Sequence, residues 1–427
     1  MKLWQIHVKT GLEIFTMENL PKNHRIIFLW FIRYLCIIFC VLFLAFWSNT
    51  SSAEIIKIGE INPLSGRLAK NGIEIHQGIE VAVAEANEAG GVNGKQLRLI
   101  SRDDQSQPDV AISRAEELCS WEKVAALTGG YVDSLVGPIA AVAKKYQIPY
   151  VASASLQKEL VQHENLYFFR VSRLQGFVEP LCGILAEHFK PQHLAILHAA
   201  TPGSTELARD LEHCFKIHGL KVQLIEKFRP GMPDFTPLIA KLAAMKIDVI
   251  VSGGFTPDHI LLVRQLKENK VSPKAYIGPF GIAYESFIRT MGKDANYLYS
   301  TCAWHPGITE PGTEATSKAF VQKFHQMFNR QPNTTNMHGY TSARALIAAM
   351  RTVLHNGQPL TGDNIRIALT KLDLILPMEH LAFEKNGDPL HYRHMVVQIQ
   401  KERLVVVYPS DRAAAQPIYP TPSWDQR

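Results

Sequence analysis

Short runs of Val, Ile and Leu alternate with amphipathic segments along the chain after residue 54. The runs are nearly continuous in apolar residues, as expected for strands covered on both faces, and the segments between them have helical spacing. The expected strands are 55–61, 96–102, 124–128, 149–152, 193–198, 222–228, 248–252 and 275–278, and the expected helices are 73–89, 110–120, 135–146, 177–189, 205–218, 235–245 and 258–269. This alternation predicts an α/β fold built on doubly wound parallel sheets.

The alternation occurs twice, with residues 170–172 between the two series, which predicts two lobes of similar construction. Three further helix-like stretches, a hairpin and a tail with several Pro residues follow, at 314–328, 340–355, 363–372, 396–408 and 409–427. We predict four parts, since a chain of this length forms more than one packed unit. They are a signal peptide at 1–53, lobe I at 54–171 plus 302–377, lobe II at 172–301 plus 378–408, and an irregular tail at 409–427.

The first 53 residues have the pattern of an export leader. Arg25 precedes apolar residues, and after Arg33 an uninterrupted apolar run of 14 residues, 34–47, leads to small residues at Ser51 and Ala53. This order is typical of a secretory signal, and we expect cleavage after Ala53 and a periplasmic mature protein. The alternative is an uncleaved membrane anchor, if Arg33 is tolerated inside a longer apolar run.

The net charge of the chain without its leader bears on whether nucleic acid is a partner. The chain has 45 Lys and Arg and 39 Asp and Glu, a net charge of +6. Residues 1–53 contain five of the basic and two of the acidic residues, so the mature chain has a net charge of +3. The remaining basic residues are interleaved with acids, which argues against nucleic acid as a partner. Whether Met1 or Met17 is the start of the chain stays open.

Four Cys remain after the leader, widely spaced and without a CxxC pair: Cys119, Cys182, Cys214 and Cys302. One disulfide bond is compatible with an exported protein, but the spacing does not identify its partners. Cys182 and Cys214 lie on neighbouring expected helices, and the alternative is that they are two small buried apolar side chains. His391 and His394 have no Cys or carboxylate at ligand spacing, so we expect no metal site.

The sequence motifs of catalysis and cofactor binding are missing. No G-x-S-x-G surrounds a Ser, no G-x-G-x-x-G follows the first strand, and the Gly-Lys at 94–95 lacks the rest of a phosphate-binding loop. Asp103 and Asp104 follow an expected strand, where capping the next helix is a commoner role than catalysis. We therefore expect neither an enzyme nor a bound cofactor.

Small and hydroxyl-bearing residues follow the expected strands of the first lobe, in the loops 62–72, 129–134 and 153–155. Ligands of open parallel sheets bind beyond the carboxyl ends of the strands, where backbone N–H groups and Ser hydroxyls hold a small polar group. The alternative is that these residues are only helix caps and tight turns. The candidate ligand-binding residues in these loops are Asn71, Tyr131, Asp133, Ser134, Ser153 and Ser155.

A run of Asn-Glu-Ala-Gly-Gly-Val-Asn-Gly-Lys at 87–95 joins an expected helix to an expected strand. Pro-Leu-Ser-Gly at 63–66 precedes it and Asp-Asp at 103–104 follows. In this order the motifs resemble the periplasmic leucine/isoleucine/valine-binding protein family, the type I solute-binding proteins of ABC importers, over roughly residues 55–408. The resemblance implies two lobes joined by a hinge of three chain crossings, which we place near 170–172, 300–303 and 376–378.

The resemblance also implies a function. Members of this family trap a small solute between two lobes that close by hinge bending, and they present the closed form to a membrane permease. We expect a monomeric, periplasmic substrate-binding component of an ABC importer, with a small-molecule ligand and an inner-membrane permease as partners. The alternative is a periplasmic sensor or regulator of the same fold that signals to a partner protein.

In the first lobe, the residues that the resemblance implies for the ligand head group are altered. Amino-acid binders of the family have a Ser or Thr after the third strand that holds the α-carboxylate, and this chain has Asp133 at that position. After the fourth strand they have a Thr that holds the polar head of the amino acid, whereas here Ser155 is followed by Leu156. The disulfide partners of some members are absent at the matching places, near Ser106 and Val132. An ionised Asp133 repels a carboxylate and favours a cation or an amide N–H.

The second lobe departs from the family pattern as well. The Tyr that closes over the ligand corresponds to about Gly203 and the ammonium-binding Glu to Phe280, whereas an aromatic residue is kept as Phe255. We expect Phe255 and Phe280 to line the ligand site with Tyr131, as its apolar walls. Each unpaired charged end in a closed cleft costs about 1–3 kcal/mol, so an amide, amine or aromatic solute fits better than a branched-chain amino acid. The alternative is an alignment slip of one or two residues, which returns Ser134 and Ser155 to a ligand carboxylate.

Overall fold

The computed structural model describes Trp30 and residues 33–35, 55–162 and 165–427. By its internal contacts the chain divides into two units, Met1–Glu54 and Ile55–Arg427. The expected signal peptide and its cleavage site lie outside the described residues, apart from Trp30 and residues 33–35, which are helical. Within the described part of the chain, we find no helix with the length and apolar character needed to cross a membrane.

The first sheet of the unit Ile55–Arg427 has five strands, all parallel, in the order β2-β1-β3-β4-β5. The strands are β1 Ile56–Asn62, β2 Leu97–Asp103, β3 Ala126–Tyr131, β4 Tyr150–Ala154 and β5 Phe168–Arg170. The helices between them are α2 Ala69–Glu88, α3 Pro108–Glu117, a π-helical turn η2 Leu118–Glu122, α4 Asp133–Tyr146 and α5 Glu159–Gln162. Nearly every residue of β1, β3 and β4 is buried, which explains their continuous apolar sequences.

The second sheet has seven strands in the order β14-β13-β10-β9-β8-β6-β7. The strands are β6 Leu194–Ala199, β7 Val222–Phe228, β8 Val249–Gly253, β9 Ala275–Gly278, β10 Tyr299–Cys302, β13 Met395–Gln400 and β14 Arg403–Tyr408. The helical elements are α6 Gln175–Ile184, η3 Leu185–Phe189, α7 Pro202–Ile217, α8 Thr236–Ala244, α9 Thr256–Glu268, α10 Glu285–Met291 and η4 Gly292–Ala295. Strands β6 to β10 pair in parallel, whereas β13 is antiparallel to both β10 and β14, which confirms the expected hairpin. The α/β prediction with two doubly wound sheets is therefore confirmed, and the second sheet is mixed at one edge.

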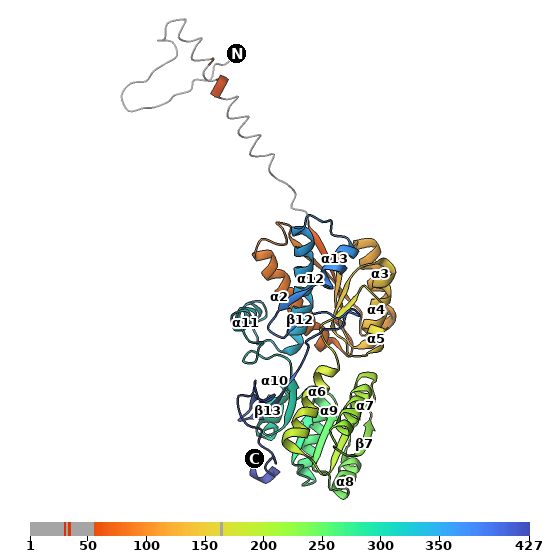
Figure 1. The fold of residues 1–427 in the computed structure, drawn as a ribbon, viewed down its shortest axis with the longest axis vertical. Helices are drawn as coiled ribbons and strands as arrows, with labels where there is room; N and C mark the ends of the chain where they lie inside the picture. Colours follow the sequence, from red (N-terminus) through yellow and green to blue (C-terminus); the bar gives the residue numbers. More distant parts are fainter. Residues whose placement is uncertain (1–29, 31–32, 36–54, 163–164) are drawn as a thin grey trace, which may run out of the picture. The chain divides into compact units, whose positions relative to one another are not determined.

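Three helices from the last third of the chain complete the part of the fold that contains the first sheet (Figure 1). They are α11 Glu314–Phe328, α12 Thr334–His355 and α13 Gly362–Leu369, and a small antiparallel pair, β11 Asp373–Ile375 and β12 His380–Ala382, follows them. Helices α2 and α12 lie in one hydrophobic cluster of the core and α3 and α4 in another, so the first sheet is covered on two sides. Segments far apart in the sequence therefore build one layered structure.

The chain passes between the two sheets beside β5. The backbone N–H of Arg170 donates to the carbonyl of Gly387 at 3.1 Å, and the Arg170 side chain forms an ion pair with Asp388. From Asp388 the chain continues directly into β13 of the second sheet. The residues after β14 contain only a short 3-10 helix, η5 Trp424–Gln426, and the Tyr299 hydroxyl holds them by donating to the carbonyl of Ile418.

Candidate ligand-binding site

Asp133 and Ser155 come together because β3 and β4 are neighbouring parallel strands whose carboxyl ends lie at the same edge of the sheet. Oδ1 of Asp133 accepts three hydrogen bonds, from the Ser155 hydroxyl at 3.0 Å, the Leu156 backbone N–H at 2.7 Å and the Gln157 backbone N–H at 2.9 Å. The carboxylate of Asp133 is therefore tied to the loop after β4 through one of its two oxygens.

Arg170 holds this loop from the opposite side. Its side chain is completely buried, and its Nη1 donates to the carbonyls of Ser155 at 3.3 Å and Gln157 at 2.8 Å. The charge of the guanidinium is balanced by the ion pair of 2.5 Å with Asp388. A planar guanidinium with several fixed donors can bind a carboxylate and two carbonyls at once, so it makes the loop rigid.

The orientation of one peptide unit follows from these contacts. The carbonyl of Ser155 accepts from both Arg170 and the Ser172 hydroxyl, the latter at 3.1 Å. In a trans peptide the C=O and the following N–H point in opposite directions, so this carbonyl directs the N–H of Leu156 toward Asp133. The donors that meet Asp133 are thus positioned by buried groups behind them.

Val132, immediately before Asp133, has a strained backbone. Its φ is +64°, in a region that a β-branched residue rarely adopts and that costs about 1–3 kcal/mol. The N–H of Val132 donates to the carbonyl of Ala154 at 3.1 Å, which fixes the turn between β3 and α4. Strain of this kind persists where the surroundings determine the geometry, and here it places Asp133 at the first residue of α4.

The second oxygen of Asp133 faces the part of the chain that contains the second sheet. A Cβ placed on Gly203, in the first turn of α7, would lie 3.8 Å from Asp133 Oδ2. Helix N-termini attract negative charge. Nearby, Lys158 from the loop after β4 forms an ion pair of 2.7 Å with Asp210 of α7. The loop after β4 and helix α7 therefore lie against each other, between the elements of the two sheets.

Tyr131 ends β3 and belongs to a second polar group. Burial raises the pKa of Tyr131, and the nearby Tyr284 and Glu74 raise it further. Burial raises the pKa of Tyr284 to about 12, and its hydroxyl lies 3.4 Å from Oγ1 of Thr335. Burial also raises the pKa of Glu74, against hydrogen bonds from Asn333 and Thr335 that lower it. The two Tyr hydroxyls stay protonated at neutral pH and can act as hydrogen-bond donors.

Other candidates in the first three loops do not join Asp133. Ser153 is completely buried, and its hydroxyl lies 2.8 Å from the hydroxyl of Ser342 on α12. Ser134 is exposed at the second residue of α4, and Asn71 is half-buried in the first turn of α2. Of the hydroxyl residues predicted for the site, the structure brings Ser155 to Asp133 and turns Ser153 toward the core.

The two Phe candidates lie beside strand ends of the second sheet. The ring of Phe280, after β9, makes an edge contact with Phe177 of α6 at a centroid distance of 5.1 Å, and Phe177 in turn lies 3.8 Å from the ring of His394. Phe255 precedes α9, and its N–H donates to the carboxylate of Asp258. Phe280 therefore adds to an aromatic group, whereas Phe255 packs with the core beneath the second sheet.

No sequence pattern marks Arg170, Lys158, Glu74 or Tyr284 as part of this region. The one available signal is Arg170 itself, because an Arg behind two Phe residues in a strand needs buried partners. Lys158 and Asp210 lie in polar segments that resemble any exposed surface. Their pairing depends on the approach of two distant elements, so no local pattern indicates it.

Two cavities lie away from these residues. One, of about 330 Å³, is lined by Arg173, Glu179, Glu310, Met378, Glu379, His380, Leu390, His391, Tyr392 and Arg393. The other, of about 380 Å³, is lined by Glu226, Lys227, Phe228, Arg229, Met232, Pro237, Leu238 and Lys241. In the cavity of about 330 Å³, burial raises the pKa of Glu379 well above its usual range. Neither cavity is lined by a residue predicted for the ligand site.

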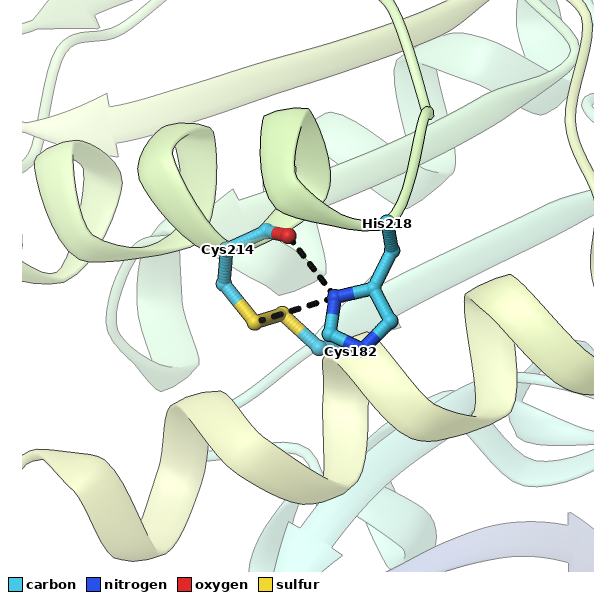
Figure 2. The surroundings of a disulfide bond; sticks show 3 residues. All are labelled: Cys182, Cys214 and His218. Atoms are coloured by element: carbon cyan, nitrogen blue, oxygen red, sulfur yellow. Dashed lines mark hydrogen bonds between the residues drawn. A yellow bond between two sulfur atoms is a disulfide. The ribbon is translucent and has the colours of Figure 1, made fainter.

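Cys182 of α6 and Cys214 of α7 form a disulfide bond beside His218 (Figure 2). The Nδ1 atom of His218 lies 2.9 Å from the Cys214 carbonyl oxygen and 3.8 Å from its sulfur. These three side chains are also the one group in the described part of the chain with the spacing of a metal site. The sulfurs are bonded to each other and so offer no thiolate to a metal. The alternative of two separate apolar side chains is wrong, while Cys119 and Cys302 are free and buried.

Comparison with known proteins identifies the fold. A sequence model of the periplasmic binding protein family matches residues 55–403. The leucine-, isoleucine-, valine-, threonine- and alanine-binding protein of Pseudomonas aeruginosa is 25% identical over 358 residues, covering 84% of this chain and 93% of that protein. Leu/Ile/Val-binding protein homolog 2 of Brucella abortus is 26% identical over 356 residues, covering 82% of this chain and 91% of that protein.

Solved structures agree with the sequence relatives. The branched-chain amino acid transporter substrate-binding protein LivJ from Streptococcus pneumoniae, in complex with isoleucine, has a TM-score of 0.73 and 21% identity, covering 82% of this chain and 98% of that one. A solute-binding protein of an ABC transporter from Rhodopseudomonas palustris, in complex with 3,4-dihydroxybenzoic acid, has a TM-score of 0.72 and 18% identity, covering 87% and 99%. The chain belongs to the periplasmic binding protein family and is similar to its leucine/isoleucine/valine-binding members.

Proposed function

We propose that the cleft beside Asp133 binds a small polar solute that offers an N–H donor, as an amide or an amine does, for delivery to a membrane permease. The observation that carries this proposal is the asymmetry of the Asp133 carboxylate. Its Oδ1 accepts three hydrogen bonds from the loop after β4, whereas Oδ2 accepts none from the described residues and faces Gly203. An oxygen in that position favours a ligand donor and repels a ligand carboxylate.

The remaining residues of the region support this choice of solute. Tyr131 and Tyr284 have protonated hydroxyls, and Phe280 provides an apolar surface. Aromatic walls with a few fixed polar groups are typical of small-molecule sites. By its name, the Pseudomonas aeruginosa protein binds leucine, isoleucine, valine, threonine and alanine, and the two solved structures hold isoleucine and 3,4-dihydroxybenzoic acid. At 25% identity or less, a change of head group is compatible with the shared fold.

Pairs of ligands that differ only in the head group test the proposal. Native mass spectrometry of gently purified protein identifies co-purified solutes, and calorimetry then compares leucine with leucinamide and isobutyrate with isobutyramide. We expect the amide of each pair to bind at least about tenfold more tightly, because an ionic ligand oxygen beside Asp133 is unfavourable. Tighter binding of leucine than of leucinamide would contradict the proposal.

We also propose that the leader is cleaved after Ala53, and that the mature protein is a periplasmic monomer with no catalytic activity and with the two lobes predicted above. The basic, apolar and small residues of the leader support cleavage. N-terminal sequencing of the exported protein should begin at Glu54, and sedimentation should give the mass of one mature chain. A membrane-bound protein with its leader intact would favour the anchored sensor instead.

A further inference from the structure

We infer that Asp133 is an internal anion that fills a preformed anion-binding site in the cleft wall, and that it thereby makes the protein reject ligands with a free carboxylate. This inference deepens the proposed function and rests on it for the location of the cleft. The contacts of Asp133 define the anion site, so it can be tested without knowing the solute.

The donors around Asp133 are those that a carboxylate requires. Two successive backbone N–H groups, of Leu156 and Gln157, and the Ser155 hydroxyl all reach one oxygen at 2.7–3.0 Å. Hydrogen bonds to an ionised acceptor are shorter and stronger than neutral ones. The first turn of α4, where Asp133 lies, adds the partial positive charge of a helix N-terminus. The loop therefore binds a carboxylate, and the chain supplies that carboxylate itself.

The donors do not depend on Asp133 for their position. Arg170 donates to the carbonyls of Ser155 and Gln157. The Ser172 hydroxyl accepts from the backbone N–H of Ser155 and donates to the Ser155 carbonyl. Both supporting side chains are buried, and neither touches the Asp133 carboxylate through a hydrogen bond. Removal of the Asp133 side chain therefore leaves an ordered group of donors without an acceptor, which favours the uptake of an external anion.

Chemical rescue of Asp133→Ala with formate tests this directly. Formate stabilises a protein that binds it in the folded state. In sodium formate at about 0.2 M, relative to sodium chloride at the same concentration, we expect the unfolding temperature of Asp133→Ala to rise by about 2 °C or more. The wild-type protein should have equal unfolding temperatures in the two salts.

Two further variants separate filling of the site from general effects of salt. Asp133→Asn keeps an acceptor oxygen in the site without a charge, so it should show no response to formate. Asp109→Ala removes an exposed acidic residue from the first turn of α3, a matched position without a surrounding loop of donors, and should behave as the wild type. If Asp133→Ala does not fold, Asp133→Ser replaces it, because Ser is well tolerated at the start of a helix.

Ligand specificity gives the second readout. Calorimetry should show that Asp133→Ala or Asp133→Ser gains at least about tenfold in affinity for leucine relative to the wild type. Absence of the formate response in both variants overturns the inference, and so does an equal response in the wild type. Formate rescue without a gain for leucine supports the anion site but contradicts the rejection of carboxylates, which is the part that rests on the proposed function. The two failures are therefore distinguishable.

Discussion

His338, Tyr392 and His394 form a buried chain of hydrogen bonds between helix α12 and the residues that lead into β13. His338 donates from Nδ1 to the carbonyl of Thr334 at 2.8 Å, so its Nε2 accepts from the Tyr392 hydroxyl at 3.1 Å. His394 then donates from Nε2 to the Tyr392 oxygen at 2.6 Å. Each N–H or O–H group in this series of hydrogen bonds has an acceptor only if both imidazoles are neutral.

We expect the pH dependence of stability to report on His338. Burial lowers the pKa of His338 to about 4, below its usual 6.5, so the unfolded chain binds the proton more readily than the folded one. The stabilisation is complete above pH 6.5 and is lost as the pH falls toward 4. The wild-type protein should therefore lose unfolding free energy as the pH falls from 6.5 toward 4. In His338→Gln this loss should be smaller by on the order of 3 kcal/mol.

Chemical denaturation at several pH values between 4 and 8 measures this curve. His213→Gln, at an exposed position of α7, is the control and should leave the wild-type curve unchanged. Buried His259 and His394 also have lowered pKa values, so some acid sensitivity remains in His338→Gln. Equal curves for His338→Gln and the wild type would show that this chain of hydrogen bonds does not control acid stability.

Helices α2 and α12 approach each other closely at two glycines, and this contact determines how the first sheet is covered. A Cβ on Gly78 would lie 1.8 Å from the carbonyl oxygen of Asn336, and one on Gly339 would lie 2.1 Å from that of Ile75. The Asn336 side chain donates to the carbonyl of Glu74 at 2.7 Å between the same helices. Backbone meets backbone here, so a side-chain rotation cannot relieve a clash.

We expect Gly78→Ala to lower the free energy of unfolding by about 1–3 kcal/mol or more, because the helices must separate to admit the methyl group. Gly137→Ala is the matched control in helix α4, where the nearest atom to an added Cβ is a side-chain methyl of Leu160 at 3.1 Å. That side chain can move, and Ala is the better helix former, so the control should be close to neutral. Equal destabilisation by the two variants in urea titrations would contradict this account of the helix contact.

At the scale of the whole molecule, a few polar contacts join the elements of the first sheet to those of the second. The ion pair of Lys158 with Asp210 is the shortest of those described above, and the hydroxyls of Tyr284 and Thr335 form another contact. Both partners of the ion pair are partly exposed, so its contribution is within the 0–1 kcal/mol typical of surface pairs. Under the proposed function, such a contact affects the approach of the two sheets around a solute more than the stability of either side.

Lys158→Met should therefore weaken binding of the co-purifying solute by up to about fivefold, with the unfolding free energy nearly unchanged. Calorimetry at low and high salt measures the effect, which should decrease as salt screens the pair. Lys241→Met breaks a pair with Glu226 that lies within the second-sheet part, and it serves as the control. A similar loss of affinity in both variants would rule out a specific role in closure.

The sequence predicts the elements well because they are long and strongly patterned, but the directions of individual side chains depend on where a strand ends. The helix expected at 135–146 is α4, Asp133–Tyr146, and the strand expected at 149–152 is β4, Tyr150–Ala154. Alternation along a strand would put Ser153 and Ser155 on one face. Because β4 ends at Ala154, Ser155 turns to Asp133 while Ser153 faces α12.

The ordered loop around Asp133 was not predictable, because residues far along the chain create it. Arg170 positions the loop and is itself neutralised by Asp388, which is 218 residues away. No spacing rule connects such positions in a single sequence. The pairing of the ends of β3 and β4 was accessible from the strand order, whereas the donors that Arg170 directs at Asp133 required the folded backbone.

The contact between α2 and α12 has a consequence for the order in which the protein is assembled. The hydrogen bond from Asn336 to Glu74 spans 262 residues, so the layer that contains the first sheet cannot close until most of the chain has been synthesised. The strands β6 to β10, in contrast, lie within one continuous stretch of sequence. Because contacts distant in sequence form slowly, the strands β6 to β10 should reach their native packing before helix α12 covers the first sheet.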